Sequence, residues 1–118
     1  MAQWLDKRLP KKLRSLVSPA ERTQQTAHPL QRVYELEKKV GVGGTAEDLL
    51  AAVGWPDQTG TVLVIGHQPM LGQVAARLIG GTEADWPVKK GGVWWISHRV
   101  RGTEAQTVVR AVMNPDMV

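Results

Sequence analysis

Arg22 and His67 could bind and act on an anionic group, and they stand at equivalent points of the sequence. Each follows a short apolar run, close to a proline where a helical pattern begins. In a parallel sheet, two strand-to-helix junctions lie on the same edge, where such sheets bind ligands. A guanidinium binds phosphate oxygens, and an imidazole can donate to a phosphoryl oxygen and stabilise transition-state charge. The spacing therefore predicts a shared phosphoryl pocket.

Each of the two residues also has a purely structural interpretation. His67 could merely satisfy backbone groups at its junction, and Arg22 could pair with a nearby acid or be solvated. A cation in the first turn of a helix opposes the helix dipole, at a cost of about 0.3–1 kcal/mol. The position of Arg22, four residues after Ser18, makes sense if an anion lies between the guanidinium and the helix N–H groups.

The first junction is predicted from a strand at residues 13–17 and a capping motif. Ser18 can cap a helix, Pro19 suits the first helical position, and Glu21 lies three residues after the cap. This pattern predicts a helix that runs to about residue 30. The second junction follows residues 62–66, which predict a strand buried on both faces, and it leads into a helix from about 69 to 80.

The other segments alternate between helix and strand in the same way. They are a helix fragment at 2–8, a strand at 33–36, a helix at 45–53 capped by Thr45 with Asp48, and two strands at 92–100 and 105–112 that can form a hairpin. Strands alternating with helices predict an α/β fold, a three-layer α/β/α sandwich with a mostly parallel sheet. The hairpin would add an antiparallel edge, and residues 1–118 suit a single domain.

Composition narrows the possible partners. The formal charge of +4, from 15 Lys and Arg against 11 Asp and Glu, favours anionic ligands. The absence of cysteine excludes disulfides, thiol chemistry and Cys-type zinc sites. The few aromatic residues are scattered, which argues against a nucleic-acid stacking platform. No run has membrane-spanning length and the first residues lack the apolar core of a signal peptide, so a cytoplasmic protein without membrane attachment is expected.

Two segments resemble signatures of a known enzyme family. Residues 16–27, Leu-Val-Ser-Pro-Ala-Glu-Arg-Thr-Gln-Gln-Thr-Ala, resemble the second signature of the histidine phosphatase superfamily (phosphoglycerate mutase-like). Residues 64–70, Val-Ile-Gly-His-Gln-Pro-Met, resemble its later signature. The Met-Ala-x-Trp-Leu opening and residues 89–95 resemble in particular the SixA type of phosphohistidine phosphatase, so the resemblance covers essentially the whole chain.

This resemblance implies roles for three residues. Arg22 would bind the phosphoryl group, His67 would be the second histidine of the catalytic pocket, and Ser18 would help shape the junction. The family's reaction has two steps, in which a nucleophilic histidine takes the phosphoryl group and water then releases phosphate. SixA-like members need no metal or other cofactor, and their open pocket suits a phosphohistidine-bearing protein or a small phosphorylated substrate.

One motif of the family does not occur in the sequence. The family begins with a central strand ending in Arg-His-Gly, whose histidine is the nucleophile, and no Arg-His-Gly occurs here. His28, near a helix end, and His98, in a late strand, lack that context. The fold is thus expected to be N-terminally incomplete and the chain as written nearly inactive, with apolar surface and unpaired strand edges exposed.

Three origins of the missing motif are open. A shortened form or a misplaced start codon is favoured, ahead of a natural inactive short form and of a homo-oligomer in which another copy supplies the strand.

The sequence leaves three candidate functions. The leading one is a phosphatase acting on phosphohistidine in a signalling protein. The alternatives are a non-catalytic module that binds phosphate or a phosphoprotein, and a nucleic-acid binder suggested by charge alone.

Overall fold

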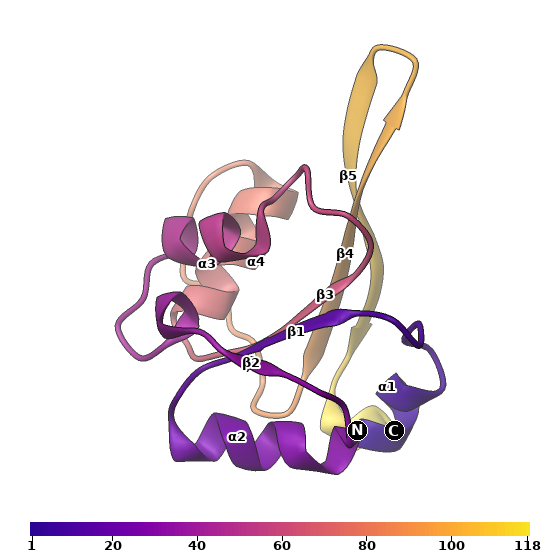
Figure 1. Cartoon of the computed structure of the whole chain (residues 1–118). Coiled ribbons are helices and arrows are strands. Elements are labelled where there is room, and N and C mark those ends of the chain that lie inside the picture. Colours follow the sequence, from indigo (N-terminus) through magenta and orange to yellow (C-terminus); the bar gives the residue numbers. More distant parts are fainter.

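A three-stranded parallel sheet forms the centre of the molecule, in a computed structural model that describes residues 1–118 (Figure 1). Its strands are β1 (Arg14–Val17), β2 (Glu35–Leu36) and β3 (Val62–Ile65), in the order β2-β1-β3. β1 lies in register with both neighbours, and Val17 is opposite Leu36 on one side and Ile65 on the other. The carboxyl ends of β1 and β3 therefore meet at one edge of the sheet.

Helices cover both faces of this sheet. Helix α2 (Glu21–Ala27) lies on one side, and α3 (Ala46–Val53) and α4 (Met70–Gly80) lie on the other (Figure 1). A short helix α1 (Ala2–Asp6) precedes the sheet, and α2 continues as a 3-10 turn over His28–Leu30. The layered α/β architecture predicted from the alternating pattern is confirmed.

The buried core lies mainly on the side of α3 and α4. It is a cluster of apolar residues from these helices and the segment before α3, namely Val40, Ala46, Leu49, Met70 and Val74. The predicted capping box holds the start of α3, because the Thr45 hydroxyl accepts from the Asp48 amide and the Asp48 carboxylate accepts from the Thr45 amide.

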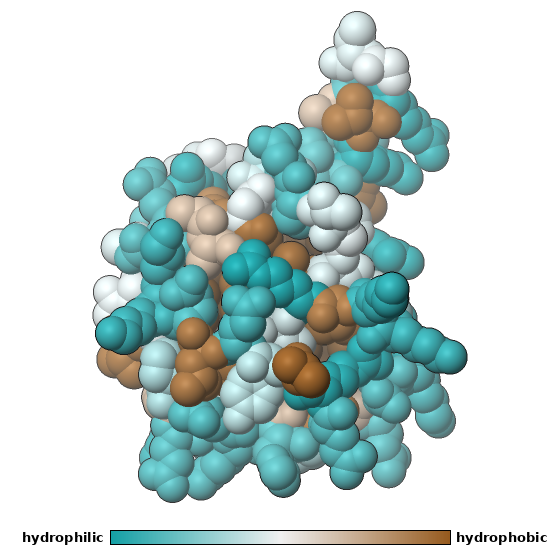
Figure 2. Space-filling view, viewed as in Figure 1, coloured by the Kyte–Doolittle hydropathy of each residue, from teal (hydrophilic) through white to brown (hydrophobic).

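The C-terminal strands form a second sheet. β4 (Val93–Arg101) and β5 (Glu104–Met113) pair as an antiparallel hairpin, and Gly102 takes a φ of 63° at the turn. The expectation that this pair extends the parallel sheet is wrong, because neither strand is hydrogen-bonded to β1, β2 or β3. The end of the hairpin projects beyond the rest of the molecule, and some apolar residues are exposed there (Figure 2).

β3 is less buried than its apolar sequence predicts. All four of its residues are half-buried, whereas Leu16 and Val17 of the neighbouring β1 are fully buried. The prediction that β3 is covered completely is therefore wrong. The reason is that β3 has a neighbour on one edge only, and its second edge borders a cavity that separates it from β4.

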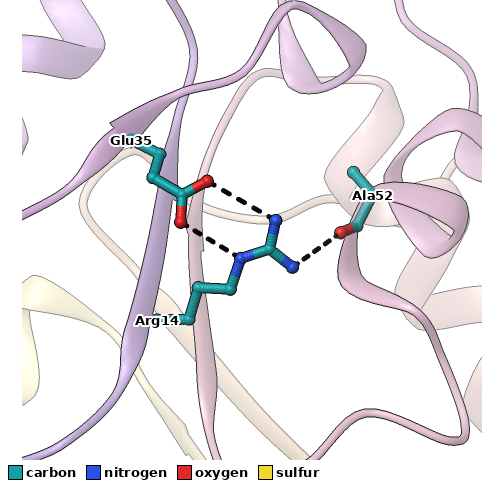
Figure 3. A network of polar contacts seen from close by, with 3 residues as sticks. All are labelled: Arg14, Glu35 and Ala52. Atoms are coloured by element: carbon teal, nitrogen blue, oxygen red, sulfur yellow. Dashed lines mark hydrogen bonds and ion pairs between the residues drawn. The ribbon is translucent and has the colours of Figure 1, made fainter.

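A polar contact ties the start of β1 to its surroundings (Figure 3). Arg14 Nε lies 3.3 Å from Glu35 Oε1, which links β1 to β2. A second guanidinium nitrogen of Arg14 donates to the carbonyl oxygen of Ala52 at 3.2 Å, and this hydrogen bond links β1 to α3. Both side chains of the ion pair are about half exposed, so it contributes at most about 1 kcal/mol.

Candidate functional site

Ser18 and His67 come together where β1 and β3 end. The amide of Ser18 donates to the carbonyl oxygen of Ile65 at 3.0 Å, which continues the ladder between the two strands by one residue. This bond sets Ser18 beside the turn that follows β3. The Nε2 atom of His67 then lies 2.7 Å from the Oγ atom of Ser18. Ser18 is fully buried and His67 is half-buried, so the pair has an inner and an outer member.

Ser18 does not cap α2 in the predicted way. The helix begins at Glu21 with Ala20 in the N-cap position and no side-chain cap, so the predicted capping box is wrong. The Ser18 hydroxyl is hydrogen-bonded to His67, and its oxygen also accepts from the Ala20 amide at 3.3 Å. At the start of α2 the Thr23 hydroxyl donates a hydrogen bond to the Ser18 carbonyl oxygen at 2.8 Å.

Arg22 is the second residue of α2, and its side chain is exposed. It forms no ion pair or side-chain hydrogen bond, so the alternative that Arg22 is neutralised by a nearby acid is wrong for this structure. Arg22 and His67 line the same cavity, which has a volume of about 800 Å³. That the two residues bind a phosphoryl group together stays a prediction.

The cavity lies between β3 and β4 and has a mostly apolar wall. Its charged residues are all cations, namely Arg22, Lys89, Lys90 and Arg110, and no aspartate or glutamate lines it. Fixed charges of one sign along a concave surface raise the local concentration of oppositely charged ligands. The wall therefore favours an anion, in agreement with the expectation from net charge.

Gln68 holds the segment after β3 in place, a function that the sequence did not indicate. Its side-chain oxygen accepts from the Gly72 amide at 2.7 Å, and its side-chain nitrogen donates to the Trp86 carbonyl oxygen at 3.0 Å. Gly72 is buried, and a Cβ atom there would overlap the Trp86 carbonyl oxygen. Glycine at this position lets the loop before β4 lie directly against α4.

The other two histidines are not part of the Ser18–His67 pair. His28 is exposed at the end of α2. His98 lies in β4, edge-on to Trp55 with ring centroids 5.5 Å apart, and its Nδ1 atom is buried without a partner. His98 lines the cavity, but it is not hydrogen-bonded to Ser18 or His67.

Two structural findings concern metals and membranes. No group of three or more His, Asp or Glu side chains is close enough to hold a metal ion. None of the helices has the length and apolar character needed to cross a membrane.

The sheet, its covering helices and the position of the pocket define the phosphoglycerate mutase-like class of α/β folds. A solved structure from Nakamurella multipartitia with the provisional name phosphohistidine phosphatase SixA has this fold, with a TM-score of 0.73. The match covers 97% of this chain and 77% of that chain at 23% sequence identity, so the predicted SixA-like fold is confirmed. No protein-family model matches the sequence, and none of the curated proteins compared with it does.

Proposed function

We propose that Ser18, Arg22 and His67 form a phosphoryl-binding pocket and that the chain is a phosphohistidine phosphatase-like protein. The observation that carries this proposal is the 2.7 Å contact between His67 and the buried Ser18, in a cavity that Arg22 also lines. A hydrogen-bond donor and an unpaired guanidinium at the carboxyl edge of a parallel sheet suit a phosphoryl group. The fold shared with the Nakamurella structure supports the same function.

Each residue has a distinct function in this proposal. Arg22 neutralises and orients the phosphoryl oxygens with its guanidinium fork. His67 donates a hydrogen bond to a phosphoryl oxygen and stabilises the negative charge that develops in the transition state. Ser18 is a positioning residue, because its buried hydroxyl holds one ring nitrogen and fixes the plane of the imidazole.

The nucleophile of the reaction is not among the histidines of this chain in our proposal. Neither His28 nor His98 contacts the Ser18–His67 pair, and Arg-His-Gly does not occur in the sequence. We therefore expect these 118 residues to bind a phosphoryl group with little turnover. The same observation favours the second candidate function, a non-catalytic module that binds phosphate or a phosphoprotein.

The proposed partner is a phosphohistidine-bearing signalling protein in the cytoplasm. The open cavity, the unpaired Arg22 and the wall of cations support an anionic macromolecular partner over a membrane. The scattered aromatic residues argue against nucleic acid.

Phosphate binding tests the pocket directly. Inorganic phosphate should shift the NMR signals of the His67 ring and the Ser18 amide in a saturable way. Arg22→Ala should lower the phosphate affinity about tenfold, as expected for losing one charge-assisted contact. Arg99→Ala is the matched control, because Arg99 is an exposed cation outside the cavity, and it should leave the affinity unchanged. Equal losses in both variants would show binding to general positive charge and reject the pocket.

Turnover distinguishes the two candidate functions. Release of phosphate from a phosphohistidine protein is measured for the chain as written and for a version extended by a strand ending in Arg-His-Gly. We expect hydrolysis by the extended version only. Robust hydrolysis by the short chain that is abolished in His28→Ala or His98→Ala would contradict the assignment. Phosphate binding without hydrolysis in both versions would favour the binding module.

A further inference from the structure

The outer edge of β5 has no partner within the chain. β5 is hydrogen-bonded only to β4, and no other backbone group bonds to it. Its pairing with β4 is regular from the turn up to Val109, and the register shifts only beyond that residue. This part of the strand is mostly exposed, and the end of the hairpin projects beyond the rest of the molecule (Figure 1). A regular, exposed strand edge is a template for pairing with another strand.

The hairpin turn sets which residues of β5 face this outer edge. In an antiparallel ladder, alternate residues exchange hydrogen bonds with the neighbouring strand, and the residues between them direct their backbone groups the other way. Arg101 and Glu104 pair across a two-residue turn, and the pair that closes such a turn is a hydrogen-bonded one. Counting on from Glu104 in steps of two, positions 106 and 108 also face β4. The outer edge is therefore formed by the backbone groups of Ala105, Thr107 and Val109.

The two charges of β5 complement each other under a twofold rotation. Glu104 and Arg110 are the only charged residues of the strand, and five uncharged residues separate them. Both are exposed, and neither forms an ion pair within the chain. When a second β5 lies antiparallel with Thr107 opposite Thr107, Glu104 of each copy lies opposite Arg110 of the other. The same register pairs Ala105 with Val109, so the outward-facing residues bond to one another.

We propose that the β5 strands of two copies of this chain pair antiparallel about Thr107 and form a twofold dimer. The two hairpins then make one continuous sheet in the order β4-β5-β5-β4. A second copy is favoured over another protein because the edge carries both charges at a self-complementary spacing. A register shifted by two residues keeps the outward-facing residues together but separates Glu104 from Arg110. The pairing uses neither β3, nor the inner edge of β4, nor the phosphoryl pocket, so it does not depend on the proposed function.

Sedimentation velocity at increasing protein concentration measures this dimer. The parent chain should dimerise reversibly with a dissociation constant of about 100 μM or tighter, which is the range of weak protein contacts. Thr107→Pro should weaken the dimer about tenfold or more, because proline removes an outward N–H group and leaves the bonds to β4 intact. Thr107→Val is the matched control, since it keeps the N–H group and the branched shape, and it should dimerise like the parent.

Two charge variants test the register. Glu104→Arg and Arg110→Glu each place like charges opposite one another, so each variant alone should dimerise about tenfold more weakly than the parent. Mixed in equal amounts, the two variants should recover the affinity of the parent, because every glutamate again lies opposite an arginine. Glu83→Arg is the control, since it makes the same charge change at an exposed acid outside β5, and it should leave the affinity unchanged.

Three outcomes would overturn the proposal. A parent chain that is still monomeric at several times the expected dissociation constant would show that the edge does not pair. A dimer that is insensitive to Thr107→Pro, or a mixture of the charge variants that stays as weak as each alone, would place the contact elsewhere. Growth beyond two copies would show that the assembly is not closed by a twofold axis, since each copy offers one outer edge.

Discussion

His67 and Ser18 are 49 residues apart in the sequence, yet their side chains meet at 2.7 Å. Their contact is possible because β1 and β3 are adjacent and parallel, so both strand ends reach the same edge of the sheet. The hydrogen bond can run in either direction, depending on which ring nitrogen of His67 carries the proton. In both cases the buried serine fixes the orientation of an imidazole that borders the cavity.

Loss of the Ser18 hydroxyl should destabilise the protein and free the His67 ring. We expect Ser18→Ala to lower the free energy of unfolding by about 1–3 kcal/mol, because a part-buried polar contact is lost. Urea denaturation measures this change. Ser15→Ala in β1, three residues earlier, is the matched control, since Ser15 Oγ is buried without a partner. Removal of that hydroxyl should be neutral or stabilising, and equal losses in the two variants would contradict the prediction.

Close packing at Gly72 should make this position intolerant of a side chain. Gly72→Ala forces α4 and the loop at Trp86 apart, and overpacking of this kind costs about 1–3 kcal/mol. Thermal unfolding of the purified variant measures the cost. Gly80→Ala in the same helix should cost less, because its Cβ would lie 3.2 Å from a ring carbon of Trp86 rather than in overlap with backbone. The opposite order of stability would show that Gly72 is not limited by this contact.

The capping box of α3 should give stability a defined pH dependence. Hydrogen bonds from the Thr45 backbone and side chain hold the pKa of Asp48 below its ordinary value of 3.8. A carboxyl with a lowered pKa in the folded state stabilises fully above the unfolded pKa, and this contribution is lost as the pH falls through the folded pKa. The difference in unfolding free energy between the parent and Asp48→Asn should therefore be largest near neutral pH and shrink below about pH 3.8.

Glu47→Gln is the control for this measurement, because Glu47 lies in the same helical turn, forms no capping box and makes only a solvent-exposed ion pair with Arg77. Its effect should show a weaker dependence on pH. A difference for Asp48→Asn that stays constant from pH 7 to pH 2 would contradict the prediction.

The Arg14–Glu35 pair should contribute little to stability. Both side chains are exposed by about half, so solvent screens their attraction. Glu35→Gln should lower the free energy of unfolding by less than about 1 kcal/mol, and the loss should shrink further in high salt. Chemical denaturation at low and high salt concentration measures both effects. A large, salt-insensitive loss would mean that the pair is effectively desolvated.

Local patterns predicted most elements correctly. The helix at 45–53 carries a capping pair and a glycine stop within a few residues, and α3 spans Ala46–Val53. The strand at 13–17 and the hairpin at 92–112 were also predicted close to their observed positions. These signals succeed because capping, periodicity and turn chemistry act between residues near in sequence.

Predictions that depended on remote neighbours were less successful. Ser18 was expected to cap α2, but its hydroxyl is hydrogen-bonded to a histidine 49 residues away. The arrangement of Gln68 and Gly72 around the Trp86 carbonyl had no signal in the sequence, because the loop from 82 to 91 has no periodic pattern to predict its path.

The sequence by itself determined the fold class, the order of its elements and the shared edge at which β1 and β3 end, because parallel strands joined by helices bring successive junctions to one side. Unpaired edges were expected from the missing central strand, but only the tertiary structure showed that they belong to β3 and β4. Apolar, β-branched residues predict that a segment is a strand, but they do not specify which edge finds a partner. That pairing depends on contacts between distant segments, and here it leaves a cavity between two open edges.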